Sequence, residues 1–164
     1  MDFIHHYQSP LGTITMASDE TTLVGLWFDG QKHFANTINP DAPEKSLPIF
    51  SQTDKWLDIY FSGTAPNFTP PLKMRTTPFR QFVWNIMLTI PYGKTMTYGE
   101  IAAKIANRKG LVKMSAQAVG GAVSHNSISL IIPCHRVLGV DRKLTGYAAG
   151  LDKKFKLLKL ENII

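Results

Sequence analysis

The chain has 164 residues, of which 44% are hydrophobic and 18% are charged, a composition typical of one large or two small globular domains. Its single cysteine excludes an internal disulfide framework and a cysteine-rich zinc finger. No run approaches ~18 consecutive apolar residues, and the N-terminus lacks the basic and apolar regions of a secretory signal, so we expect no transmembrane helix and no such signal. A free thiol then favours a reducing, cytoplasmic location.

The formal net charge of +6 is unevenly distributed along the chain. Residues 1–75 carry five Lys or Arg against eight Asp or Glu, a balance of −3, whereas residues 76–164 carry thirteen against four, a balance of +9. This asymmetry indicates that the second half meets a polyanion. On charge alone, a basic solvated surface without a nucleic-acid partner stays open.

The first half of the chain predicts strands followed by a helix. Strand and turn residues predict a hairpin of Phe3–Gln8 and Thr13–Ala17 around a Ser-Pro-Leu-Gly turn, with a third strand near Leu23–Phe28. Apolar residues at helical spacing predict a helix over Pro48–Phe61. Residues 62–78 are rich in proline and glycine and are interpreted as a linker.

The second half predicts helices. Thr77 and Pro78 form a helix start, with an apolar face that runs up to Ile90. A short helix is predicted over 97–105, and another over 115–124 after a glycine-containing turn. Two short helices joined in this way on the basic side of the chain indicate a helix-turn-helix.

The second of these helices, SAQAVGGAVS, consists almost entirely of small side chains. The pair Gly120-Gly121 disfavours the helix by roughly 1 kcal/mol for each glycine relative to alanine. One interpretation is a surface that another backbone, such as that of DNA, approaches closely. Tight packing against a neighbouring helix is the other, and the sequence alone leaves both open.

The only cysteine lies in the stretch LIIPCHRVLG. Pro133 fixes φ and predicts a turn, which can bring Cys134 and His135 to the same side. A base that activates a thiol needs a group that orients it, and Glu161 in the last helix is the candidate carboxylate. On residue chemistry alone, Cys134 is either a nucleophile or a buried hydrophobe.

The sequence around Cys134 resembles a known family. PCHRV at 133–137 is preceded by NSISLII and followed by LTGYAAGLDKKFKLLKLE, and the stretch PFRQFVWNIMLTIPYGKTMTYGEIAAKIA begins at Pro78. These motifs closely resemble the O6-alkylguanine-DNA alkyltransferases and cover essentially all of residues 78–161. The resemblance of the first half is weaker and rests on QSPLGTITMAS.

The resemblance implies two domains. Residues 1–75, with the linker, would form an α/β domain of the ribonuclease H-like kind, a small antiparallel sheet plus a helix. Residues 76–164 would form a mainly α, winged-helix-like DNA-binding domain. The implied activity is a single, irreversible transfer of an alkyl group from O6-alkylguanine, and from O4-alkylthymine, in double-stranded DNA to Cys134. The protein would act as a monomer without a membrane or a cofactor.

The resemblance also implies roles for individual residues. His135 would be the base that acts on the Cys134 thiol through a water, and Glu161 would orient its imidazole. Asn126 would hold the turn before the active-site strand. Tyr98 would donate to the departing guanine, which is otherwise a poor leaving group. The implied pocket for the flipped base comprises Tyr98, Val137, Tyr147 and Ala148.

The small-residue helix would enter the minor groove, and the damaged nucleotide would be flipped into the pocket. The family commonly places an arginine on this helix, where the present chain has Gln117. Glutamine has donors and an acceptor but no charge, so the way in which the base is flipped stays open. The residues expected to face DNA are Ser115, Ala116, Gln117, Gly120, Gly121, Arg108, Lys109 and Lys113. For the last three, a merely solvated loop stays open.

Two alternatives remain. One is an alkyltransferase-like module that binds lesions without repairing them, although such relatives lack the cysteine. The other is a Cys-His-Glu hydrolase, which would turn over. Some family members carry a structural zinc in the N-terminal domain, but this chain has no cysteine there, and His5, His6 and His33 do not make a tetrahedral set. We therefore expect no metal.

Overall fold

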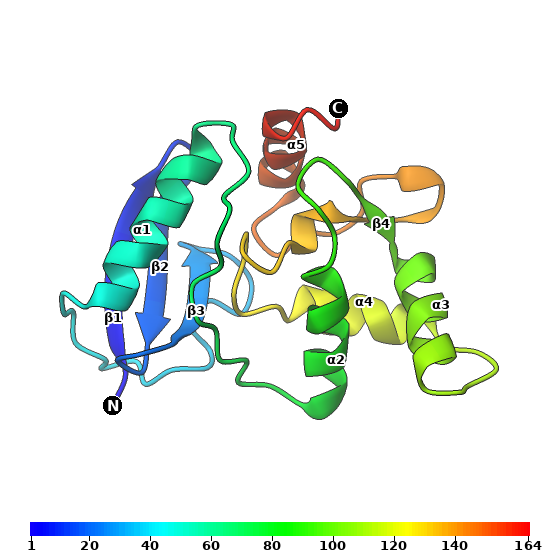
Figure 1. The fold of residues 1–164 in the computed structure, drawn as a ribbon, viewed down its shortest axis with the longest axis horizontal. Coiled ribbons are helices and arrows are strands. Elements are labelled where there is room, and N and C mark those ends of the chain that lie inside the picture. The colour runs from blue at the N-terminus through cyan, green and yellow to red at the C-terminus, as the bar shows by residue number, and fades with distance from the viewer. The chain divides into compact units, whose positions relative to one another are not determined.

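The computed structural model describes all residues 1–164, which form two compact units (Figure 1). The first comprises Met1–Arg75 with Ser127–Ser129, and the second comprises Thr76–Asn126 with Leu130–Ile164. Ser127–Ser129 joins the first unit because the Leu26 N–H donates to the Ser127 carbonyl and the Leu26 carbonyl accepts from the Ser129 N–H, both at 2.9 Å. A single domain boundary near residue 75 would assign Ser127–Ser129 to the second unit, whereas these residues belong to the first.

The first unit contains a three-stranded antiparallel sheet in the order β1 (Phe3–Ser9), β2 (Gly12–Ser18), β3 (Leu23–Phe28). The turn between β1 and β2 is closed by the Ser9 hydroxyl, which donates to the Gly12 carbonyl at 2.6 Å. Gly12 has φ = 114°, a left-handed conformation that favours glycine. The expected hairpin and third strand are therefore present.

The helix α1 (Pro48–Phe61) packs against β1 and β2 (Figure 1). Ala17, Val24 and Trp27 form a buried cluster within this unit. Gly25 is required beside it, because a Cβ atom at this position would lie 2.0 Å from the Trp27 ring. The sequence pattern of the first half thus produces a sheet with a helix on it and a small apolar core.

The second unit contains α2 (Pro78–Met87), α3 (Tyr98–Arg108) and α4 (Ala116–Ser124), which contact one another. The expected helix up to Ile90 ends earlier, because its last residues form tight turns before Pro91. α3 instead runs three residues beyond the predicted end at residue 105. The helix-turn-helix pair corresponds to α3 and α4.

Side-chain caps fix where these helices begin. The hydroxyls of Thr77, Thr97 and Ser115 each accept from the backbone N–H three residues further on, at 3.0–3.3 Å. The Trp84 indole of α2 donates to the Ala122 carbonyl of α4 at 2.9 Å. These contacts define the position of α4 relative to α2.

The rest of the second unit holds short elements and one helix. β4 (Met96–Thr97) pairs in parallel with β5 (Val137–Leu138), and η2 (Val140–Arg142) and α5 (Leu151–Leu160) follow. The apolar residues 130–132, before the cysteine, form turns rather than a strand, so the strand of this region is β5, which follows the cysteine. No helix of the chain is both long enough and apolar enough to span a bilayer.

Candidate active site

Cys134 lies directly after a tight turn. The Cys134 N–H donates to the Ile132 carbonyl at 2.8 Å across Pro133, whose φ of −82° and ψ of 68° are those of an inverse γ-turn. A single 3₁₀ turn, η1 (Cys134–Arg136), follows, and the Cys134 side chain is buried. The turn expected at Pro133 is present and places the thiol inside the second unit.

Asn126 holds this turn from the end of α4. Its side-chain amide donates to the Ile132 carbonyl at 2.8 Å, so that carbonyl accepts from both Asn126 and Cys134. The Asn126 side chain also hydrogen-bonds the thiol. Because Asn126 is buried, its amide fixes the Cys134 turn in the interior.

His135 is fully buried, and its side chain hydrogen-bonds that of Glu161. The His135 Nε2 and Glu161 Oε2 atoms are 2.6 Å apart. Burial lowers the pKa of His135, so its imidazole is neutral at neutral pH and carries one ring proton. An ionised carboxylate only accepts, so we assign that proton to Nε2. Nδ1 is then the unprotonated, basic nitrogen.

Arg136 anchors the carboxylate that orients His135. Its Nε donates to Glu161 Oε1 at 2.8 Å, and its Nη1 donates to the Ile90 carbonyl at 2.9 Å. The Gly93 N–H donates to the same Glu161 oxygen at 3.0 Å. Burial raises the pKa of Glu161, but its contacts with His135 and Arg136 outweigh burial and lower the pKa to about 2. The carboxylate is therefore ionised and fixed.

The Cys134 thiol itself is protonated at rest. Burial raises its pKa, and the Asn126 side chain, the charge of Lys154 and the Tyr147 hydroxyl offset only part of this effect. A buried, protonated thiol needs a base before it attacks. The neutral imidazole of His135, next in sequence, is a group of the required kind.

A groove of about 530 Å³ opens in the second unit between the start of α3, one face of α4 and the segment after β5. It is lined by Thr97, Tyr98, Gly99, Ala116, Gln117, Gly120, Gly139, Val140, Asp141 and Thr145. Burial raises the pKa of Tyr98, so its hydroxyl keeps its proton and remains a donor. The sequence predicts Tyr98 and Gln117 as site residues but not Val140 and Thr145. The sequence indicates a site role for these two residues only by their position between the cysteine and the last helix.

The other residues expected at the base pocket do not line this groove. The Tyr147 hydroxyl is buried without a hydrogen-bond partner in the protein, and burial together with the nearby Cys134 raises its pKa well above the usual range. Val137 is fully buried, and Ala148 is half-buried. Tyr147 is therefore next to the nucleophile, whereas a substrate contact of Val137 or Ala148 stays a prediction.

The exposed face of α4 carries the small side chains. Gly121 has no atom within 4 Å of where a Cβ would lie, so it is open to solvent, and Gly120 lies beside the Tyr98 ring at an ordinary contact distance. Ser115 is exposed, but its hydroxyl accepts the Ala118 N–H as the cap of α4. This face therefore permits the close approach of another backbone.

The basic residues before α4 are exposed but differ from one another. Lys109 Nζ lies 4.9 Å from the centre of the Phe82 ring and 5.8 Å from that of Phe79, so it makes a cation–π contact with α2. Arg108, the last residue of α3, and Lys113, in the loop before α4, are exposed. Phosphate contacts by these three residues stay a prediction.

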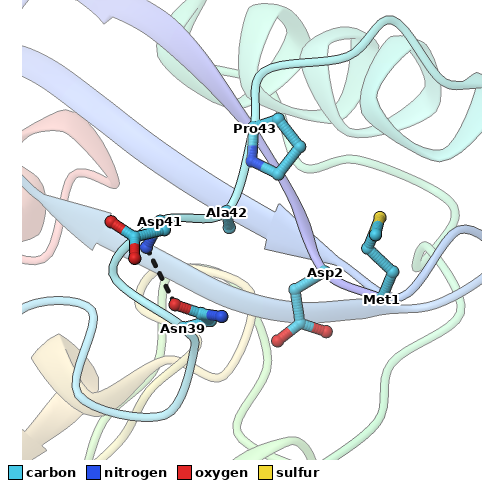
Figure 2. A pocket seen from close by; sticks show the side chains of 6 residues that line it. All are labelled: Met1, Asp2, Asn39, Asp41, Ala42 and Pro43. Carbon is cyan, nitrogen blue, oxygen red and sulfur yellow. Dashed lines mark hydrogen bonds between the residues drawn. The ribbon is translucent and has the colours of Figure 1, made fainter.

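Another pocket, of about 450 Å³, lies in the first unit, and Asp2 and Asp41 are the ionisable side chains in its lining (Figure 2). In it, the Asn39 side-chain oxygen accepts from the Asp41 N–H at 2.9 Å. Asp2 is engaged by Arg75, whose Nη1 and Nη2 donate to its two oxygens at 2.8 and 2.7 Å. We assign no site there.

The two histidines of β1 contact acidic side chains. His5 Nε2 is 2.9 Å from Asp54 Oδ2, and His6 Nε2 is 2.9 Å from Glu44 Oε1. Nowhere in residues 1–164 do three His, Cys, Asp or Glu side chains converge in a way that could hold a metal ion. That the protein needs neither a metal nor a cofactor stays a prediction.

Each of the two units matches a domain of a known protein family. A profile described as 6-O-methylguanine DNA methyltransferase, ribonuclease-like domain, matches residues 3–74, and one described as the DNA binding domain of the same protein matches residues 78–163. Fold and site thus define a protein in which a ribonuclease-like domain is followed by a DNA-binding domain that carries a buried cysteine.

Whole-chain relatives agree. The chain is 43% identical over 155 residues to a methylated-DNA–protein-cysteine methyltransferase of Methanosarcina acetivorans, covering 94% of this chain and 95% of the relative. It is 40% identical to that of Haemophilus influenzae, covering 96% and 85%. The crystal structure of Mycobacterium tuberculosis OGT in complex with DNA superposes with a TM-score of 0.84 at 38% identity, covering 97% and 92%. The chain belongs to the 6-O-methylguanine DNA methyltransferase family, and the predicted family and fold class are confirmed.

Proposed function

We propose that this protein repairs DNA by direct reversal, taking the alkyl group from O6 of a modified guanine in double-stranded DNA onto Cys134. The observation that carries the proposal is the buried hydrogen bond of 2.6 Å between His135 Nε2 and Glu161 Oε2. His135 lies on the same turn as the chain's single cysteine. Supporting it, curated relatives that match over nearly the whole chain are methylated-DNA–protein-cysteine methyltransferases.

The site performs the transfer in one displacement. His135 Nδ1 takes the thiol proton through a water, and the carboxylate of Glu161 stabilises the resulting imidazolium. Cys134 Sγ then bonds to the alkyl carbon as the carbon–O6 bond breaks, and the electron pair passes to the guanine. The Tyr98 hydroxyl, which keeps its proton, donates to the departing base. The product thioether has no base-labile bond, so each protein reacts once.

The second half of the chain binds the DNA. Its charge balance of +9, from thirteen basic and four acidic residues, attracts the phosphate backbone. The small exposed face of α4 enters the minor groove, and Gln117 at the rim of the groove contacts the base left behind by flipping. In support, the Mycobacterium tuberculosis relative was solved in complex with DNA.

The finer assignments follow the same reasoning. Residues 76–164 carry the reaction, and residues 1–75 form the accompanying ribonuclease-like domain. O4-alkylthymine is a second substrate. The protein acts as a monomer, and its free thiol favours a cytoplasmic location.

The test is incubation with a duplex oligonucleotide that contains O6-methylguanine, followed by intact-mass measurement and peptide mapping. We expect one methyl group per protein, located on Cys134, and none in Cys134→Ser. Product beyond one equivalent would identify a hydrolase. Tight binding to the lesion without an adduct would identify a lesion-binding module, and either result would overturn the proposal.

A further inference from the structure

Lys154 is a fully buried lysine that the reaction described above does not use. It lies on α5, and its Nζ donates to the carbonyls of Val137 at 2.7 Å, Thr145 at 2.7 Å and Gly146 at 3.2 Å. An ammonium group has three N–H donors, so these bonds satisfy all of them. The contacts therefore fix the direction as well as the position of the side chain.

These three carbonyls lie on two segments of the active site, the strand after Cys134 and the segment before Tyr147. Val137 begins β5, directly after the turn that holds Cys134. Thr145 and Gly146 precede Tyr147, whose buried hydroxyl interacts electrostatically with Cys134. The same helix ends beside Glu161, two turns after Lys154. One ammonium group thus joins the nucleophile's strand, the pocket segment and the helix of the relay carboxylate.

The positive charge of Lys154 has no acidic partner, because none of the chain's ion pairs includes it. Burial lowers its pKa to about 8, which shows that its site disfavours the cation, while the charge of Cys134 acts in the opposite direction. Burying a cation without a counter-ion costs desolvation free energy, which hydrogen bonds to carbonyls offset only in part. The anion that can appear nearby is the Cys134 thiolate.

We propose that Lys154 is a positioning residue that holds the pocket segment against the nucleophile's strand and stabilises the Cys134 thiolate by its charge. This rests on the proposed function only in that Cys134 is the alkyl acceptor. It is distinct from the His135–Glu161 relay, which removes the proton, because Lys154 acts on the anion that remains.

Other groups also face the thiol, and their effects differ in sign. Asn126 and Tyr147 lower the pKa of the thiol, as Lys154 does by charge. Tyr98 of α3 interacts with it electrostatically, and burial keeps both tyrosines protonated. The neighbouring charges of Arg136 and Glu161 are paired with each other. Lys154 is therefore the unpaired cation in the surroundings of Cys134.

The experiment uses the fact that the chain has one cysteine, so the ultraviolet absorbance of thiolate against pH reports Cys134 alone. Lys154→Met removes the donors and the charge, whereas Lys154→Gln keeps two donors without the charge. The matched control is Lys159→Met, which removes an exposed lysine from the same helix. Circular dichroism and urea unfolding show which variants are folded.

Lys154 is charged below about pH 8, so we expect both Lys154 variants to disfavour thiolate formation in that pH range, with the control unchanged. Near neutral pH, about tenfold less thiolate should then be present, and alkylation by iodoacetamide should slow by the same factor. Single-turnover transfer from the O6-methylguanine duplex should shift its pH profile in the same direction. Lys154→Met should also slow transfer more than Lys154→Gln, because only it frees the pocket segment.

Titration and pH profiles of folded Lys154 variants that superimpose on the wild type would overturn this proposal. If Lys154→Met does not fold, Lys154→Gln decides the charge effect. The thiol titration does not depend on DNA, so the proposal on Lys154 can stand or fall even if the wild-type protein transfers no methyl group.

Discussion

The buried carboxylate of Glu161, paired with His135 and Arg136, should contribute substantially to the stability of the second unit. Its pKa falls from an ordinary 4.5 to about 2, which corresponds to about 3 kcal/mol of stability at neutral pH, at ~1.4 kcal/mol per pKa unit. Glu161→Gln removes the charge and leaves the Arg136 cation buried without it. Breaking a buried pair in this way destabilises proteins by about 3–5 kcal/mol, so both routes predict a loss of this size.

The dependence on pH has a definite sign. A carboxyl group with a depressed pKa stabilises the folded state above about pH 4.5, and this stability is lost as pH falls towards 2. By pH 3 the wild type should have lost about 2 kcal/mol from this group, and Glu161→Gln should lack that loss. Urea unfolding at pH 7 and pH 3 measures both quantities, with the exposed Glu100→Gln as control, expected within about 1 kcal/mol of wild type. A Glu161→Gln protein within about 1 kcal/mol of wild type at pH 7 would refute the reasoning.

Three further predictions follow from single contacts. Arg136→Lys keeps the charge but not both hydrogen bonds, to Glu161 and to the Ile90 carbonyl, so urea unfolding should show a loss of about 1–3 kcal/mol; an unchanged midpoint would contradict this. Gln117→Arg should accelerate methyl transfer from duplex DNA more than from the free base in single-turnover assays, whereas equal acceleration would mean that this position has no part in flipping. Gly121→Ala should stabilise the protein by up to about 1 kcal/mol, since the site is open, yet weaken DNA binding in fluorescence anisotropy titrations; unchanged affinity would show that this face does not contact DNA.

Local signals in the sequence were sufficient for most of the elements. Thr77 and Pro78 predict the start of α2 because a side-chain cap and a fixed φ act within one turn, and Thr77 does accept the Arg80 N–H. The turn at Pro133 is local in the same sense. The pairing of His135 with Glu161 spans 26 residues, so no local pattern indicates it; the prediction rests on the need for a carboxylate that orients the base and on the resemblance.

What the sequence did not reveal depends on contacts between distant residues. Glu161 accepts from the Gly93 N–H, which lies 68 residues earlier, and no residue type at Gly93 announces a backbone donor. Nothing next to Arg136 in the sequence indicates its partner, and the structure shows it anchoring Glu161. Lys154 carried a usable signal, since it lies three, four and seven residues before Leu157, Leu158 and Glu161, on one face of α5. Only tertiary packing, however, shows that this face is buried.

The arrangement also accounts for how a cysteine that reacts once can survive until its substrate arrives. Thiolates, not thiols, react with solutes and oxidants, and burial raises the pKa of Cys134, so the resting site presents little thiolate. The neutral imidazole of His135 is kept basic by its bond to an ionised Glu161, so proton removal needs no change in the relay. The step that commits the protein is therefore the arrival of an alkyl carbon in line with Sγ, because only then does removal of the thiol proton lead to a bond.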